Sequence, residues 1–118
     1  MKVMLKPDVA GANEGLSRSA EYEVIGIEAD WYRISNDEGL PFLYSPDLFT
    51  VVDASEPADW VRSRGDDGEL YAYPPQLNGV GFFEDYHDGN TDAVGAFRSY
   101  LTERGMERPA VLRGQRPG

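Results

Sequence analysis

The chain has 118 residues, which is enough for one domain with a single hydrophobic core and too few for two ordinary domains. It has no cysteine, which excludes disulfides, thiolate metal sites and a cysteine nucleophile. Its formal charge of −10, from 21 acidic and 11 basic side chains, disfavours nucleic acid and anionic membranes as partners and favours a basic one, unless the acidity serves only solubility.

The apolar run at the N-terminus is short. It ends at Lys6 and Pro7, so it predicts neither a signal peptide nor a membrane span. We therefore expect a cytoplasmic protein with no membrane partner.

The first 53 residues have the pattern of a mainly β, antiparallel structure. Apolar and acidic side chains are interleaved over residues 21–28, which is typical of a half-buried strand. Pro41 suits the first position of a strand because it cannot donate a ladder hydrogen bond. The predicted strands are residues 1–5, 21–28, 31–34, 41–44 and 49–52, with a long first loop over residues 6–20.

Three short connections join the last four of these strands. Ala29 and Asp30 form a tight reversal. Residues 36–39, Asn-Asp-Glu-Gly, predict a hairpin turn, because Asn and Asp bond their own backbone and Gly39 can adopt the left-handed conformation. Residues 45–48, Ser-Pro-Asp-Leu, favour one turn of tight helix.

This order of strands and connections around Asp30-Trp31-Tyr32 resembles that of Src-homology-3-like barrels. The resemblance covers residues 1–53 and implies a small closed barrel. It also implies that Trp31 occupies the place of an aromatic shelf residue, as in members that bind proline-rich peptides. Leu48 stands where those members have a tyrosine, and the start of the chain differs from theirs.

Residues 54–105 read as an extension packed on this barrel. Ser55 and Pro57 predict the start of a short helical turn that lays Trp60 on the barrel, and an exposed Trp60 at an interface is the alternative. Residues 64–68 predict a turn between short strands at 61–63 and 69–73. Tyr71 and Tyr73 in the second of these strands either pack on the barrel or face a partner.

One α-helix is predicted over residues 91–104. Asn90 or Thr91 caps its start, apolar residues recur at three- and four-residue spacing, and Gly105 ends it. We expect residues 106–118 to form a flexible tail, and the whole chain to be a single domain.

No constellation of residues in the sequence identifies a reaction or a cofactor. An EF-hand-like loop beginning at Asp85 or Asp88 lacks the required glycine and glutamate. His87 is the only histidine and has no identifiable serine partner. We therefore expect no catalysis, no cofactor and no metal; a small metal-dependent enzyme around His87 is the remaining catalytic alternative.

Function is instead indicated by an acidic band, since residues 65–97 contain seven acidic residues and no Lys or Arg. The Trp60-Val61 pair, the Asp-Asp-Gly turn at 66–68 and the segment 81–86 resemble small bacterial immunity proteins of polymorphic toxin systems. The resemblance implies an inhibitor that occludes a basic toxin domain. Alternatives are a peptide-binding adaptor and an acidic mimic of nucleic acid. The predicted partner-binding residues are Trp31, Trp60, Asp66, Asp67, Glu69, Tyr71, Tyr73, Glu84, Asp85 and Asp88.

Overall fold

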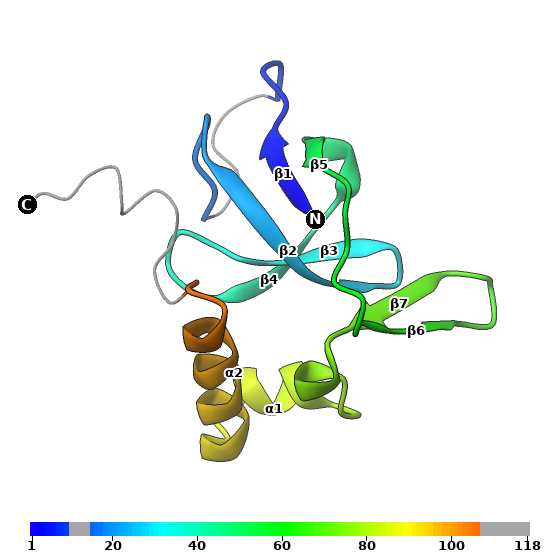
Figure 1. Ribbon diagram of the computed structural model, residues 1–118, viewed down its shortest axis with the longest axis vertical. Coiled ribbons are helices and arrows are strands. Elements are labelled where there is room, and N and C mark those ends of the chain that lie inside the picture. The colour runs from blue at the N-terminus through cyan, green and yellow to red at the C-terminus, as the bar shows by residue number, and fades with distance from the viewer. Residues whose placement is uncertain (10–14, 107–118) are drawn as a thin grey trace, which may run out of the picture.

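The computed structural model describes residues 1–9 and 15–106. Its seven strands form one antiparallel sheet, followed by two α-helices that lie side by side (Figure 1). The residue ranges are β1 Lys2–Leu5, β2 Glu21–Glu28, β3 Trp31–Ser35, β4 Pro41–Tyr44, the 3₁₀ turn η1 Pro46–Leu48, β5 Phe49–Asp53, β6 Val61–Arg64, β7 Leu70–Tyr73, the 3₁₀ turn η2 Pro75–Leu77, α1 Phe82–His87 and α2 Thr91–Glu103.

The mainly β prediction is confirmed, but the closed barrel is not. The strand order is β4-β3-β2-β1-β5, and β4 and β5 at its ends do not pair with each other in the described chain. These ends are joined by η1 and by the rings of Tyr44 and Phe49, whose centroids are 6.4 Å apart, and not by ladder hydrogen bonds. The sheet is therefore open.

Strand β2 is the centre of the sheet because three strands pair with it. Strand β3 lies along one edge, whereas β1 pairs with the first half of the other edge and β7 reaches its second half through Ile27 and Ala72. A β-bulge lies between Val24 and Gly26 opposite β3. The extra residue shifts the alternation, so that Val24 and Ile27 point to the same face of the sheet although they are three positions apart.

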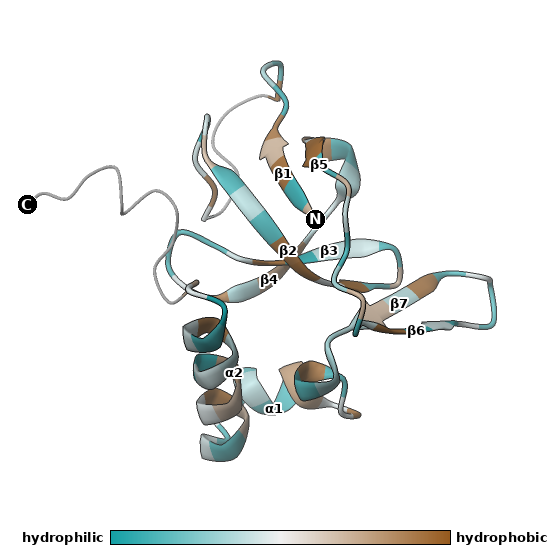
Figure 2. Ribbon diagram, viewed as in Figure 1, coloured by the Kyte–Doolittle hydropathy of each residue, from teal (hydrophilic) through white to brown (hydrophobic). Residues whose placement is uncertain are grey.

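Two hydrophobic cores result from this arrangement. The first core, on one face of the sheet, includes Val24 and Ile27, and the second, under the helices, includes Ile25. Trp60 and Ala72 belong to the first core, so the segment after residue 53 is part of the packing of the first half of the chain. Figure 2 shows hydrophobic residues on β2 and on β7, the two strands that contribute to both cores.

Most local turn predictions are confirmed. The Asn36 carboxamide accepts hydrogen bonds from the backbone N–H groups of Glu38 and Leu40, and Gly39 has φ 78°. Ser45 caps η1 and Asn90 caps α2.

Two local predictions are wrong. Residues 55–60 contain no helix but only a turn at Ala58 and Asp59, since the Ser55 side chain donates to Asp53 instead of capping a helix. The extension has two helices and not one, because Phe82–His87 forms α1, which puts Phe83 into the second core.

The structure also bears on the predicted C-terminal tail and on membrane insertion. Met106 packs on the second core, and the rest of the predicted tail, residues 107–118, lies outside the described residues, as do residues 10–14 of the predicted first loop. Among the described residues, no helix is both long and apolar enough to cross a membrane.

Candidate protein-binding surface

The connection between β2 and β3 is a two-residue turn held in an unusual backbone conformation. Ala29 and Asp30 have φ values of 50° and 72°, as the tightest hairpin turns require. The Asp30 carboxylate accepts the backbone N–H of Leu70 at 2.9 Å, and the Asp30 N–H donates to the Leu70 carbonyl at 3.0 Å. The turn is therefore fastened to the start of β7.

Trp31 follows this turn and is exposed, with 47% of its surface accessible. It lies directly opposite Glu28 across the β2–β3 ladder, so the two side chains share a face of the sheet. Ile27 and Ala72 pair and point into the first core, so their neighbours Glu28 and Tyr71 point to the other face. The face that carries Trp31 is thus continued by Tyr71.

Three carboxylates act electrostatically on the Tyr71 hydroxyl. Desolvation raises the pKa of Tyr71, and the negative charges of Glu69, Glu28 and Asp30 raise it further. The hydroxyl lies 3.4 Å from the Glu69 carboxylate. We call Glu28, Asp30, Trp31, Glu69 and Tyr71 the Trp31 corner.

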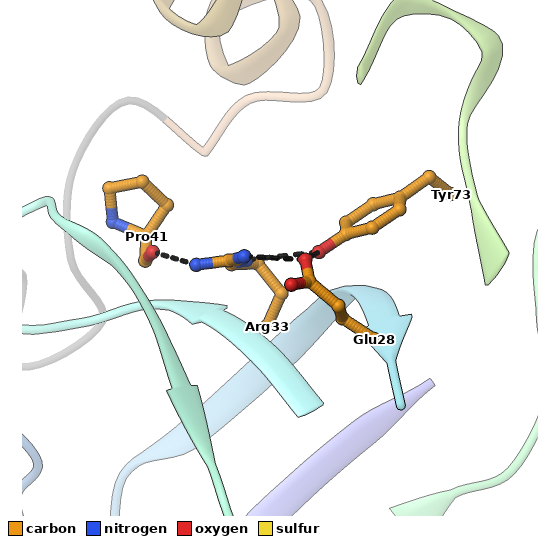
Figure 3. Close-up of polar contacts among 4 residues, drawn as sticks. All are labelled: Glu28, Arg33, Pro41 and Tyr73. Atoms are coloured by element: carbon orange, nitrogen blue, oxygen red, sulfur yellow. Dashed lines mark hydrogen bonds and ion pairs between the residues drawn. The ribbon is translucent and has the colours of Figure 1, made fainter. Parts of the chain in front are cut away.

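Beneath the Trp31 corner lies a buried polar cluster centred on Arg33, which is only 5% exposed (Figure 3). The guanidinium donates to the Tyr73 hydroxyl at 3.0 Å, the Pro41 carbonyl at 2.8 Å and the Glu28 carboxylate at 2.7 Å. Tyr73 donates to the same Glu28 oxygen at 2.8 Å, and the guanidinium carbon lies 4.1 Å from the Phe83 ring centre. The cluster ties β2, β3, β4, β7 and α1 together.

Two of the predicted contact residues are buried. Trp60 is 7% exposed and packs in the first core, as expected of a residue laid on the sheet. Tyr73 is 6% exposed, and burial raises its pKa well above the usual range of tyrosine although Arg33 opposes this effect. Both side chains support the fold and neither offers a free surface.

The acidic band is divided between two places. Asp66 and Asp67 are exposed in the β6–β7 turn, and the Asp67 N–H donates to the Glu69 carboxylate at 3.0 Å. The other three predicted carboxylates, Glu84, Asp85 and Asp88, are exposed on α1 or at its end. Figure 1 shows the β6–β7 turn projecting from one side of the molecule and α1 well away from it. Only the first group adjoins the Trp31 corner.

Two hollows of about 360 Å³ each lie elsewhere. One is between the β3–β4 turn and α2, at the opposite end of β3 from Trp31, and the other is next to Met1 and Arg104. His87 packs against the rings of Phe42 and Tyr86. Within residues 1–9 and 15–106, no three His, Asp or Glu side chains gather as a metal site would require.

Sequence reasoning named Trp31, Glu69 and Tyr71 but missed Glu28 and Asp30. The tight reversal at 29–30 was a usable signal, because it places Asp30 beside Trp31 and brings Glu28 opposite. The pairing of β7 with β2 had no such signal. Comparisons with known proteins found no matching family model, no similar curated protein and no similar solved structure.

Proposed function

We propose that this protein is a non-catalytic protein-binding module, most concretely an immunity-type inhibitor that occludes a basic bacterial toxin domain. The observation that carries the proposal is an exposed tryptophan on a fastened turn, bordered by carboxylates. Aromatic residues in this setting are typical contact residues of protein interfaces. The strand order with η1 between β4 and β5 supports the Src-homology-3-like resemblance as part of the same proposal.

Inhibition would be steric and electrostatic. Exposed carboxylates of the β6–β7 turn and of α1 attract a basic surface and speed its encounter. Trp31 and Tyr71 then provide the contacts that lose water on binding, whereas the buried Trp60 and Tyr73 hold the surface in shape. A toxin domain whose substrate site lies under this surface is blocked without any chemistry.

The test is affinity purification of the tagged protein from lysate of its native cells at about 50 and about 500 mM salt, with identification of what binds. We expect one stoichiometric basic protein that is lost at high salt and whose enzymatic activity falls when the purified inhibitor is added. Capture of several proline-rich proteins would favour the adaptor instead. Capture of nucleic-acid-binding proteins that are displaced by DNA would favour the mimic, and no salt-sensitive partner would overturn the proposal.

Two charge-reversal variants separate the two acidic groups. Asp66→Lys with Asp67→Lys changes the β6–β7 turn, and Asp85→Lys with Asp88→Lys changes α1 by the same amount. All four side chains are exposed, so both variants should fold. We expect the first variant to weaken capture more, because only the β6–β7 turn adjoins the Trp31 corner.

A further inference from the structure

The Trp31 corner has negative charge that is only partly neutralised by ion pairs among the described residues. The ion pairs found among the described residues are Arg33–Glu28, Arg62–Glu56 and Arg104–Glu23. None of them involves Asp30 or Glu69. Asp30, which directly precedes Trp31, and Glu69, which lies at the Tyr71 hydroxyl, therefore have no ion-pair partner within the described chain.

Arg64 of the β6–β7 hairpin does not neutralise this charge. Arg64 pairs with Leu70 in the β6–β7 ladder, so it points to the opposite face from Tyr71, and it donates to the Gly68 carbonyl at 2.8 Å. The residue opposite Tyr71 is Ser63, which is small and uncharged. The face of the corner is thus left open on the β6 side.

The corner is also held in place before any partner arrives. Asp30 is joined to Leu70 by two hydrogen bonds, and Glu28 is held by Arg33 and Tyr73 from below while its side chain remains 33% exposed. A group that enters such a corner does not have to order it first, which reduces the entropic cost of binding.

These observations fit one kind of occupant. Tryptophan has the aromatic face that attracts a cation most strongly, and carboxylates form strong charge-assisted hydrogen bonds with guanidinium and ammonium groups. We propose that the Trp31 corner receives a single arginine or lysine side chain of the partner, stacked on the indole and bonded to Asp30 and Glu69. This inference rests on the proposed function and specifies which group of the basic partner is recognised.

The probe is a short peptide, Gly-Gly-Arg-Gly-Gly with blocked ends, compared with the same peptide in which neutral citrulline replaces arginine. Citrulline has nearly the same shape without the charge. Binding is followed by ¹H–¹⁵N NMR of the full chain, in which the two indole N–H signals belong to Trp31 and Trp60. Trp60 is buried in the first core and serves as the internal control.

We expect the arginine peptide, and an equivalent lysine peptide, to shift the Trp31 indole signal in a saturable manner that weakens with salt. The Trp60 signal should remain in place, and citrulline should cause no shift. Equal shifts with arginine and citrulline would overturn the proposal. So would no shift at Trp31, or shifts confined to α1, which would indicate only general attraction to carboxylates.

Variants test the individual groups, read on the backbone N–H signals of residues 28–31 and 69–71. Asp30→Asn keeps the acceptor for Leu70 and Glu69→Gln keeps the acceptor for Asp67, so each removes only a charge; each should weaken binding about two- to fivefold. Trp31→Leu keeps apolar bulk without the aromatic face and should weaken binding about tenfold. Asp85→Asn, the control of equal charge on α1, should have little effect.

The proposed function and this inference fail in different ways. If the basic partner is captured as strongly by Trp31→Leu as by the natural chain, the function stands and the inference is wrong. If no basic partner exists but the peptide binds as described, the corner is a cation site and the inhibitor proposal is wrong.

Discussion

At the scale of single residues, Arg33 is the buried charged residue at the centre of the polar cluster beneath the Trp31 corner. A buried guanidinium is tolerated only when its donors are satisfied, and Arg33 reaches Glu28, Tyr73 and the Pro41 carbonyl. Stacking on Phe83 adds contact with the second core. The same cluster positions Glu28 at the Trp31 corner, so stability and binding share these atoms.

We therefore predict that Arg33→Ala lowers the free energy of unfolding by about 2–4 kcal/mol, since Glu28 and Tyr73 lose a buried partner. The lower part of this range is expected because Glu28 is 33% exposed and can be partly rehydrated. Urea denaturation measures the change. Glu28→Gln keeps an acceptor and should cost less; equal costs for both variants, or a loss below about 0.5 kcal/mol for Arg33→Ala, would contradict this account.

Buried tyrosines should make the stability of the protein fall at alkaline pH. Burial raises the pKa of Tyr22, and the hydrogen bond that its hydroxyl donates to Asp37 raises it further. Burial also raises the pKa of Tyr100, to about 12. The unfolded chain releases these protons near pH 10, while the folded chain retains them. Their contribution is fully present below about pH 10 and is lost as pH rises through the folded values.

Urea midpoints measured from pH 8 to 11 should therefore fall above about pH 10. Tyr22→Phe removes one of the groups and should reduce the slope in this window, whatever it does to stability at pH 8. A midpoint that stays constant or rises between these pH values would show that the tyrosines are not stabilised in their protonated form.

At the scale of elements, the β2–β3 turn combines strain with a contact surface. Ala29 has φ 50°, a conformation that costs a residue with a Cβ roughly 1 kcal/mol. Neighbouring structure compensates, since Asp30 and Leu70 exchange two hydrogen bonds. Strain kept at an exposed tryptophan is consistent with a turn that serves binding.

Ala29→Gly should accordingly stabilise the protein by up to about 1 kcal/mol, because glycine adopts this conformation without the steric cost. Thermal and urea denaturation measure the gain. Ala58→Gly, in an exposed turn where φ is not positive, is the matched control and should be neutral or slightly destabilising. Destabilisation by both substitutions would mean that Ala29 carries no strain.

At the scale of the whole molecule, β2 is shared by two cores and joins the two halves of the chain. Gly26 lies where β2 meets β7, and a Cβ there would overlap the Tyr73 ring and lie 3.1 Å from the Ala72 carbonyl oxygen. The backbone approach that seats hairpin β6–β7 on the sheet thus requires glycine at this position.

Gly26→Ala should lower the free energy of unfolding by about 2–3 kcal/mol through overpacking. Gly95→Ala is the same substitution at an exposed position of α2 with open space around the Cβ, and it should stabilise by about 1 kcal/mol. Opposite signs for the two variants are expected in urea denaturation. Tolerance of Gly26→Ala would show that Tyr73 is not packed against β2.

The sequence by itself determined the elements that local chemistry specifies. Strand alternation, the Asn36 turn, the Asn90 cap and the apolar stripe of α2 depend on neighbours a few residues away, and those predictions agree with the structure. Residues 55–60 were misread because Ser55 has a local competitor, Asp53, for its hydrogen bonds. Trp31 was singled out differently, by the Src-homology-3-like resemblance, and the structure leaves its side chain exposed.

Only the tertiary structure decided how distant segments meet. The sheet stays open because β4 and β5 do not pair, and β7 joins β2 across more than 40 residues of sequence. That pairing buries Tyr73, leaves Tyr71 half-buried and joins Asp30 to Leu70, the neighbour of Glu69, while α1 carries the other carboxylates elsewhere. Which aromatic residues are buried and which carboxylates stand together depends on non-local packing, and composition and spacing contain no measure of it.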